Sequence, residues 1–349
     1  MSLPVTMLAL ATAVPPYRLE QKAVAALARR VYANSFARFP KLADVFVNAG
    51  IERRHAVRPL DWYEAPRNWA ERTKAYVDGA DTLFVRAARA ALDRAGIAAR
   101  DVDVIVTVSS TGIATPSLEA RVGAEIGFRP SAMRVPVFGL GCAGGVSGLA
   151  LGARLARAAP GEVVLVVIVE LCTLAFRNDR STKADVISSA LFGDGAAAAV
   201  LRAECAEASL QIGAAAEHTW PGTLDIMGWS IDPVGFGVVL SRSLPRFVQQ
   251  RLAGPARRFV KAARVAPPQF IFHPGGAKVL DAVETALDLQ KGTLRDEREI
   301  LRDYGNMSAP SVLFVLDRAR KRGLRGAAVL AALGPGFTAS FVALAASHG

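Results

Sequence analysis

The sequence has few cysteines, and they follow no recognisable pattern. There are three, Cys142, Cys172 and Cys205, and their spacing matches neither a disulfide framework nor a set of metal ligands. An odd number of unpaired cysteines is typical of a protein that stays reduced, so we expect a cytoplasmic location. The chain has only 4 histidines and no metal-ligand spacing. We therefore expect neither a metal site nor a bound cofactor.

Long hydrophobic runs are also missing, although apolar residues make up 52% of the chain. No uncharged apolar stretch reaches the roughly 18 residues that a transmembrane helix needs, so we expect no transmembrane segment. The apolar start, 1–16, lacks a basic leader, which favours a first core strand over a signal peptide. With 349 residues, the chain is long enough for two fused units or one large α/β body.

Acidic residues are outnumbered: 31 Asp and Glu face 42 Lys and Arg, which leaves a net charge of +11. Such a charge raises the question of nucleic acid or anionic lipid as a partner. The basic residues are scattered, for example along 86–94 and 318–325, without interleaved aromatic residues or a nucleic-acid motif. We expect no nucleic-acid partner. We interpret the charge as a solvated surface that attracts a phosphate-bearing substrate or an acidic carrier protein.

Strand-like and helix-like segments alternate along an α/β chain, and the second half repeats the order of the first. In the first half the pattern predicts helices over 81–95 (starting at Asp81), 117–126 and 144–159, and strands over 103–109, 135–140, 162–169 and 195–201. In the second half it predicts helices over 277–289 and 306–322, and strands over 269–272, 327–333 and 339–346. Asn306 follows Cys142 by 164 residues, as His273 follows Ser109. This repeat predicts two halves, 1–205 and 206–349, with Cys142 and Asn306 at equivalent helix starts.

Cys142 stands in a glycine-rich corner between a hydrophobic strand and a helix of small residues. The corner reads Gly-Leu-Gly-Cys-Ala-Gly-Gly over 139–145. Unpaired N–H groups and the dipole at a helix N-terminus favour a thiolate there. The glycines allow a substrate or another backbone to come close. A lone cysteine at a tight turn is also compatible with a buried structural role, so the residues around it have to decide.

Two other segments supply possible partners for Cys142. One is Phe-His-Pro-Gly-Gly over 272–276, and the other is Tyr-Gly-Asn-Met-Ser over 304–308. Taken singly, His273 is compatible with a structural role and Asn306 with a helix N-cap. Together with Cys142 they suit acyl transfer with carbon–carbon bond formation. The thiolate would carry the acyl group, and the His and Asn N–H groups would hold a developing enolate oxygen.

These motifs resemble those of the chalcone-synthase-like, type III polyketide synthases, in order and over essentially the whole chain. The matching segments are Gly-Cys-Ala-Gly-Gly (141–145), Leu-Phe-Gly-Asp-Gly-Ala-Ala (191–197), His-Pro-Gly-Gly (273–276), Gly-Asn-Met-Ser (305–308) and Gly-Pro-Gly-Phe-Thr (334–338). Ketoacyl-carrier-protein synthases typically carry His-Gln-Ala-Asn and lack the Gly-Pro-Gly loop, and thiolases use a second cysteine in place of the Asn.

The resemblance implies the thiolase fold, with two similar halves in a layered α-β-α-β-α body, and a homodimer. It implies that Cys142 takes an acyl group from an acyl-CoA or an acyl-carrier protein, and that malonyl-CoA extends it in repeated cycles. His273 would stabilise the Cys142 thiolate as an ion pair. With Asn306, it would hold the thioester carbonyl during decarboxylation.

The resemblance also points to residues of the substrate pocket. Phe192 matches a gatekeeper phenylalanine, while a second gatekeeper falls on Val238, which suggests a wider entrance. Cys172 and Ser110 match cavity threonines, and Thr115 replaces a methionine that reaches into the partner subunit's cavity. The remaining positions that the motifs place at the pocket are Ser308, Gly334, Pro335 and Gly336. Lys278, Arg38 and Lys41 are expected to contact the CoA or carrier-protein phosphates.

Met227 and Trp229 resemble positions of bacterial synthases that accept long fatty acyl starters and make alkylresorcinols or alkylpyrones. Such a starter is physically sensible, since each buried methylene contributes about 0.8 kcal/mol. The main rivals are a malonyl-primed synthase with a naphthalene-type product and a single-condensation ketoacyl-carrier-protein synthase. A non-catalytic or nucleic-acid-binding protein with a thiolase-like body is the alternative from another class. Starter length, number of extensions, ring closure and the starter's carrier stay open at this stage.

Overall fold

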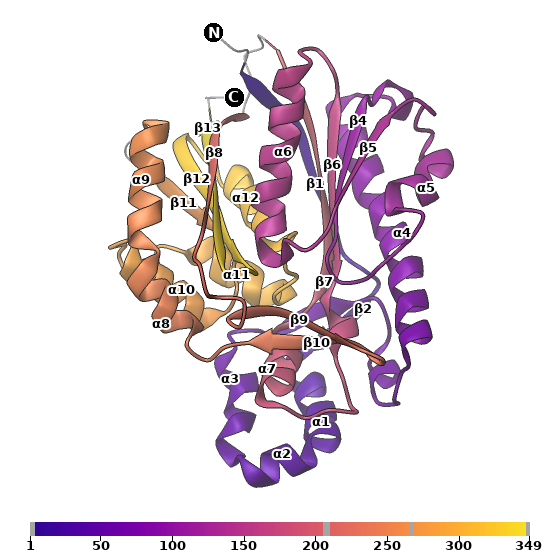
Figure 1. The fold of residues 1–349 in the computed structure, drawn as a ribbon, viewed down its shortest axis with the longest axis vertical. Coiled ribbons are helices and arrows are strands. Elements are labelled where there is room, and N and C mark those ends of the chain that lie inside the picture. Colours follow the sequence, from indigo (N-terminus) through magenta and orange to yellow (C-terminus); the bar gives the residue numbers. More distant parts are fainter. Residues whose placement is uncertain (1–3, 205–209, 266–267, 347–349) are drawn as a thin grey trace.

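The computed structural model describes residues 4–204, 210–265 and 268–346, so Cys205 and the expected boundary between 205 and 206 lie outside it. Within these residues, a nine-stranded mixed sheet runs through the molecule in the order β11-β12-β13-β8-β1-β7-β6-β4-β5 (Figure 1). Its strands are β1 (Val5–Ala13), β4 (Val104–Val108), β5 (Met133–Val137), β6 (Val164–Leu171), β7 (Asp194–Ala203), β8 (Leu210–Thr219), β11 (Gln269–Phe272), β12 (Gly326–Gly334) and β13 (Thr338–Ala346). Two strand pairs stand apart, β2 (Tyr17–Glu20) with β3 (Arg53–Ala56), and β9 (Met227–Asp232) with β10 (Gly235–Leu240).

The sheet contains the duplication that the sequence repeat predicts. In the first half, β4 pairs in parallel with β6, and β6, β7 and β1 follow as antiparallel neighbours. In the second half, β11 pairs in parallel with β12, and β12, β13 and β8 follow in the same antiparallel manner. The two halves meet through a short antiparallel pairing of β1 with β8. The expected first strand is therefore β1, in the middle of the sheet.

Helices form three layers around the two halves of the sheet (Figure 1). The middle layer, α6 and α12, packs against strands of both halves in one apolar core. Helix α4 packs on the outer face of the first half, and α8, α9 and α10 pack on that of the second. The helices are α1 (Gln21–Val31), α2 (Ala33–Arg38), α3 (Val45–Asn48), α4 (Trp69–Ala95), α5 (Leu118–Ile126), α6 (Gly144–Ala158), α7 (Lys183–Leu191), α8 (Leu244–Arg251), α9 (Ala253–Ala263), α10 (Ala277–Ala286), α11 (Arg295–Tyr304) and α12 (Ser311–Lys321). Among the described helices, none is long and apolar enough to cross a bilayer.

The predicted start of helix 81–95 at Asp81 is wrong. Helix α4 begins at Trp69, where Asn68 and Glu71 form a reciprocal capping box, and it ends at Gly96 with a left-handed φ of 65°. Asp81 lies inside the helix, and its carboxylate pairs with Arg121 of α5 at 2.9 Å. The sequence pattern does not distinguish an aspartate that pairs with a neighbouring helix from one that caps its own helix.

The predicted helix 306–322 is also wrong at its start. Helix α12 begins only at Ser311, after Ser308 with a left-handed φ of 59° and after Pro310. Asn306 lies outside the helix and forms an isolated bridge with Phe192. The repeat is imperfect here: in chain order, helix α11 precedes Asn306, whereas strand β5 precedes Cys142. Cys142 and Asn306 therefore do not occupy equivalent helix starts.

Candidate active site

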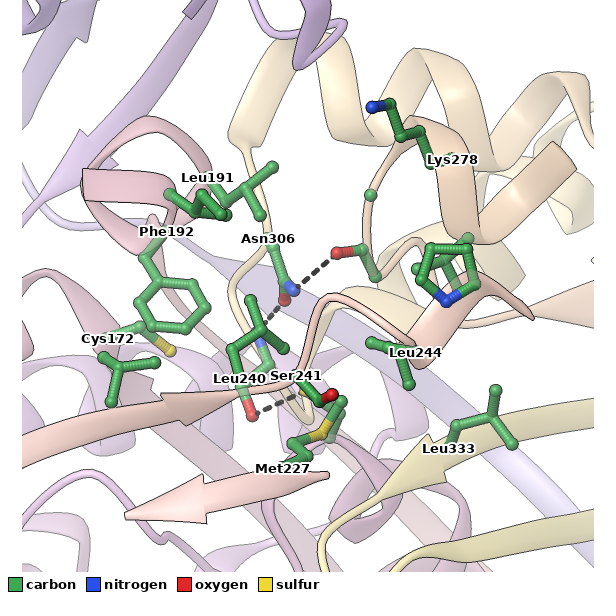
Figure 2. Close-up of a pocket in the computed structure, with 18 of the residues that line it drawn as sticks. Cys172, Leu191, Phe192, Met227, Leu240, Ser241, Leu244, Lys278, Asn306 and Leu333 are labelled. Carbon is green, nitrogen blue, oxygen red and sulfur yellow. Dashed lines mark hydrogen bonds between the residues drawn. The ribbon is translucent and has the colours of Figure 1, made fainter. Parts of the chain in front are cut away.

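A cavity of about 590 Å³ opens where strands β4, β5 and β11 end, and Cys142, His273 and Asn306 all line it. Figure 2 shows Phe192 beside Cys172 on one side of Asn306, and Lys278 on the other. The walls are mainly apolar, which suits a substrate with an apolar portion. Cys142 comes from the first half of the chain, and His273 and Asn306 come from the second.

Cys142 lies in a single 3₁₀ turn, η4 (Gly141–Ala143), that continues into α6. Gly141 has a φ of 47°, and its Cβ position would lie 2.7 Å from Pro335, so this corner requires glycine. The Ser308 hydroxyl donates a hydrogen bond to Cys142 Sγ at 3.4 Å. Burial nevertheless raises the pKa of the Cys142 thiol to about 11. Desolvation of the buried sulfur is the largest cause of this shift.

His273 follows β11 directly, and its backbone N–H donates to the carbonyl of Ala331 at 2.9 Å. The imidazole is only 4% exposed, and neither ring nitrogen has a hydrogen-bond partner among the described residues. Burial lowers the pKa of His273 to about 3, so the ring is neutral at pH 7. A buried polar group without a partner is costly, and a bound ligand would supply the missing bond.

Asn306 is held by its backbone and by both ends of its amide. Its N–H donates to the Leu191 carbonyl at 2.8 Å, and its carbonyl accepts from the Gly193 N–H at 3.0 Å. Side-chain Nδ2 donates to the carbonyl of Gly275 at 3.1 Å, and Oδ1 accepts from the Ser308 N–H at 2.8 Å. The Oδ1 contact fixes the amide, and Nδ2 keeps a second N–H that no residue of the described chain occupies.

The structure brings most of the predicted pocket residues to this cavity. Those that line it are Ser110, Cys172, Phe192, Met227, Trp229, Val238, Ser308 and Pro335, together with Lys41 and Lys278. The Trp229 indole forms part of the wall: its Nε1 donates to the Ser110 carbonyl at 2.8 Å, and its ring meets Phe192 edge-on at 6.3 Å. Val238 pairs with Trp229 across the β9–β10 ladder.

Four predicted residues do not line the cavity of the single chain. Thr115 is exposed on the loop between β4 and α5, and Arg38 is exposed at the end of α2, beside the Phe39 ring. Gly334 packs under the turn that carries Cys142, where a Cβ would lie 2.6 Å from that of Ala143. Gly336 forms the adjoining turn with a φ of 90°. Gly334 therefore supports the Cys142 corner from outside the cavity.

Glu170 is a residue of the site that the sequence reasoning did not identify. It is fully buried, and its carboxylate accepts from the Ser110 N–H at 3.0 Å and from the Thr111 hydroxyl at 2.7 Å. Burial raises the pKa of Glu170 to about 8. Ser110 in turn accepts through Oγ from the Gly141 N–H at 3.3 Å. Glu170 is thereby linked through Ser110 to the turn of Cys142, a connection that no sequence spacing reveals.

Further apolar residues of the wall were also missed, because they read as ordinary core positions. They are Ile187, Leu191, Leu240, Leu244, Phe272 and Leu333. Their alternation or helical spacing carries no sign that they face a cavity rather than another side chain.

Comparison with known proteins agrees with this geometry. The model of the N-terminal domain of chalcone and stilbene synthases matches residues 2–205, and that of the C-terminal domain matches residues 211–346. The chain belongs to the chalcone and stilbene synthase family. It is a type III polyketide synthase, an acyltransferase-class enzyme with the thiolase fold.

Relatives cover nearly the full length of this synthase. A 1,3,6,8-tetrahydroxynaphthalene synthase of Streptomyces peucetius is 37% identical over 345 residues, which cover 95% of this chain and 91% of the relative. A Bacillus subtilis relative is 34% identical over 353 residues, which cover 96% of this chain and 97% of the relative. The crystal structure of the tetrahydroxynaphthalene synthase of Streptomyces coelicolor superimposes with a TM-score of 0.93 at 28% identity and covers 99% of this chain and 100% of its own.

Proposed function

We propose that this type III polyketide synthase loads an acyl starter onto Cys142 and extends it in repeated cycles with malonyl-CoA. The observation that carries the proposal is the meeting of Cys142, His273 and Asn306 in one apolar cavity. The imidazole nitrogens of His273 and the second side-chain N–H of Asn306 have no hydrogen-bond partner among the described residues, so they are available to a substrate. No metal or cofactor is required for the steps that follow.

Loading is a transfer of the acyl group between two sulfurs. The Cys142 proton moves to His273 as the sulfur attacks the thioester carbonyl of the starter. The bond from the carbonyl carbon to the CoA sulfur then breaks, and the CoA thiolate leaves and takes a proton. Burial disfavours the charged form of each group on its own. An imidazolium next to the thiolate would offset part of this desolvation cost through the attraction between the two charges.

Extension needs donors for an enolate oxygen and no strong base. His273 and the free N–H of Asn306 would hold the thioester carbonyl of malonyl-CoA. The bond to the carboxylate carbon breaks, carbon dioxide leaves, and the electron pair forms the enolate. The enolate carbon attacks the acyl carbonyl on Cys142 and releases the thiolate. Transfer of the lengthened chain back to Cys142 starts the next cycle.

The starter in this proposal is a long fatty acyl group, with an alkylresorcinol or alkylpyrone as product, and the mainly apolar walls of the cavity support it. Ile187, Leu191 and Leu240 supply apolar surface in the cavity that Cys142 also lines, and Val238 leaves room where a larger residue would narrow the cavity. Lys41 and Lys278 stand exposed at its mouth, where they would meet the CoA phosphates. We also propose a homodimer that works in the cytoplasm, with the exposed Thr115 at the contact between subunits.

A malonyl-primed synthase with a naphthalene-type product is the second candidate. The names of the Streptomyces peucetius and Streptomyces coelicolor relatives favour it. A single-condensation ketoacyl-carrier-protein synthase would use the same residues once.

One experiment separates these functions. Purified enzyme is incubated with malonyl-CoA, alone and with acyl-CoAs of graded chain length, and product masses are measured. Alkylated tri- or tetraketides support the fatty-acyl proposal. A product formed from malonyl-CoA alone favours the naphthalene-type function, and a mass increase of one ketide unit indicates a single condensation. Absence of any acyl-enzyme or product would overturn the proposal.

A further inference from the structure

Helices α8 and α9 and the residues next to their ends carry seven exposed basic side chains. We call them the α8–α9 basic face: Arg242, Arg246, Arg251, Arg257, Arg258, Lys261 and Arg264. The whole segment 233–280 contains no Asp or Glu. Accordingly, none of these seven residues forms an ion pair with any described residue of the chain. Elsewhere on the surface, arginines such as Arg121 and Arg298 are paired with carboxylates.

This basic face begins at the mouth of the Cys142 cavity. Arg242, Leu244 and Pro245, at the start of α8, line the cavity, as does Lys278 at the start of α10. From there α8 and then α9 lead outward over the second half of the molecule, at its outer edge in Figure 1. A molecule seated on this face would therefore hold an attached arm beside the cavity mouth.

The exposed surface of these helices is charged without being amphipathic. The large apolar residues of α8 and α9, including Leu244, Val248 and Phe259, are buried against the body of the protein. Across 241–265, which the structure describes in full, no large apolar side chain is exposed. Helices that lie on a membrane insert apolar side chains, and this face has none to insert. Charge complementarity thus favours an acidic protein surface.

We infer that the α8–α9 basic face binds an acidic acyl carrier protein that delivers the starter on its phosphopantetheine arm. The inference rests on the proposed acyl transfer to Cys142 and adds the partner that supplies the acyl group. In the delivery step, the Cys142 sulfur attacks the arm's thioester carbonyl, and a new thioester forms on the enzyme. The carbon–sulfur bond to the arm breaks, and the phosphopantetheine sulfur leaves as a thiolate that takes up the proton.

The test compares two donors of the same acyl group, dodecanoyl-CoA and a bacterial acyl carrier protein loaded with dodecanoate. Loading of Cys142 is followed by intact-protein mass spectrometry at several enzyme concentrations to give a second-order rate constant. The variant is the double charge reversal Arg246→Glu with Arg251→Glu, on α8 but outside the cavity. The matched control is Arg100→Glu with Arg154→Glu. Both arginines are exposed; Arg100 lies just before the start of β4 and Arg154 in the last turns of α6, and neither lines the Cys142 cavity.

We expect the α8 variant to lose at least about tenfold in loading from the carrier protein, with a change of less than about twofold from dodecanoyl-CoA. The control variant should keep both rates. The parent's rate with the carrier protein should fall as salt is raised.

Three results would overturn the inference while leaving acyl transfer intact. The parent could load from dodecanoyl-CoA but not from the carrier protein. The loading rates of the α8 variant could fall equally with both donors, which would mean that the basic face binds CoA or that it is needed for folding. The α8 variant could instead keep its loading rates with both donors and bind vesicles of anionic phospholipid more weakly than the parent, which would mean that the basic face binds membranes. If the parent loads from neither donor, the proposed function itself fails.

Discussion

The guanidinium of Arg54 donates a hydrogen bond to the carbonyl of Phe192 at 2.9 Å, although only 2% of Arg54 is exposed. The same group donates to the carbonyls of Ser189 at 2.8 Å and Ala190 at 2.7 Å, in the last turn of α7. A buried cation here satisfies carbonyls that a helix end leaves free. Phe192 bridges to Asn306, so Arg54 positions one corner of the cavity without touching it.

Replacing Arg54 by lysine should destabilise the protein, because one ammonium cannot reach all of these carbonyls. We expect a loss of about 2 kcal/mol in the free energy of unfolding, measured in urea. Extension of the acyl chain should fall more than loading, since the Asn306 corner is displaced. Arg53→Lys is the control: the partly exposed Arg53 pairs with Asp303, and its replacement should cost less than about 1 kcal/mol. Equal effects of the two substitutions would contradict the positioning role.

Cys142 should be the acyl carrier. Cys142→Ala is expected to fold but to form no acyl-enzyme with acyl-CoA, as read by intact-protein mass. Cys172→Ala is the matched control, because Cys172 is a second buried thiol that lines the same cavity. The Cys172→Ala variant should still form the acyl adduct on Cys142. An adduct that survives in Cys142→Ala and disappears in Cys172→Ala would move the nucleophile to Cys172.

Asn306 should serve decarboxylation more than loading. In Asn306→Ala we expect the release of carbon dioxide from malonyl-CoA to fall about 10²–10³-fold, while the starter still loads. Asn306→Asp keeps an acceptor for the Ser308 N–H but loses the Nδ2 donor. Both variants should therefore lose decarboxylation. Recovery of activity in Asn306→Asp would mean that Asn306 mainly holds the local backbone.

The proton of Cys142 should respond to His273. Burial raises the pKa of the thiol to about 11 and lowers that of His273 to about 3, so the thiol stays protonated at pH 7 unless its proton moves to the imidazole to form an ion pair. In His273→Ala, the thiolate fraction and hence the rate of alkylation by iodoacetamide should rise about tenfold per pH unit from pH 7 to 9. In the parent, transfer of the proton to His273 should flatten this rise. Equal slopes in both proteins would show that His273 does not accept the proton.

The duplicated α/β architecture could be predicted from the sequence because the second half repeats the order of strands and helices of the first and the apolar strands are strongly patterned. The same reasoning placed Asn306 at a helix start, which is wrong. Polar residues near Pro310 resemble a helix cap, and only the three-dimensional pairing with Phe192 shows otherwise. Similarly, Asp81 resembled an N-cap until its partner Arg121 was known.

The candidate site could be predicted only as far as motifs reach. Cys142, His273 and Asn306 stand in distinctive glycine-rich segments, and the structure brings all three to one cavity. Arg54 could not be found, because a strand that reads Arg-Arg-His-Ala resembles a solvated surface. Glu170 is hidden in an apolar strand. The pKa of the Cys142 thiol also depends on burial of the sulfur, which no local sequence pattern reveals.

Starter length should depend on the wall formed by Trp229 and Val238. Each added methylene that enters the apolar cavity contributes up to about 0.8 kcal/mol, or about fourfold in kcat/KM. With constant malonyl-CoA, preference should therefore climb with chain length and level off once the cavity is filled. Val238→Phe adds a ring beside Trp229 and should move the plateau to shorter chains, whereas Trp229→Ala should move it to longer ones. Acyl-CoAs are kept below micelle-forming concentrations. A flat profile in the parent, or plateaus that do not move in opposite directions, would exclude this wall as the determinant of starter length.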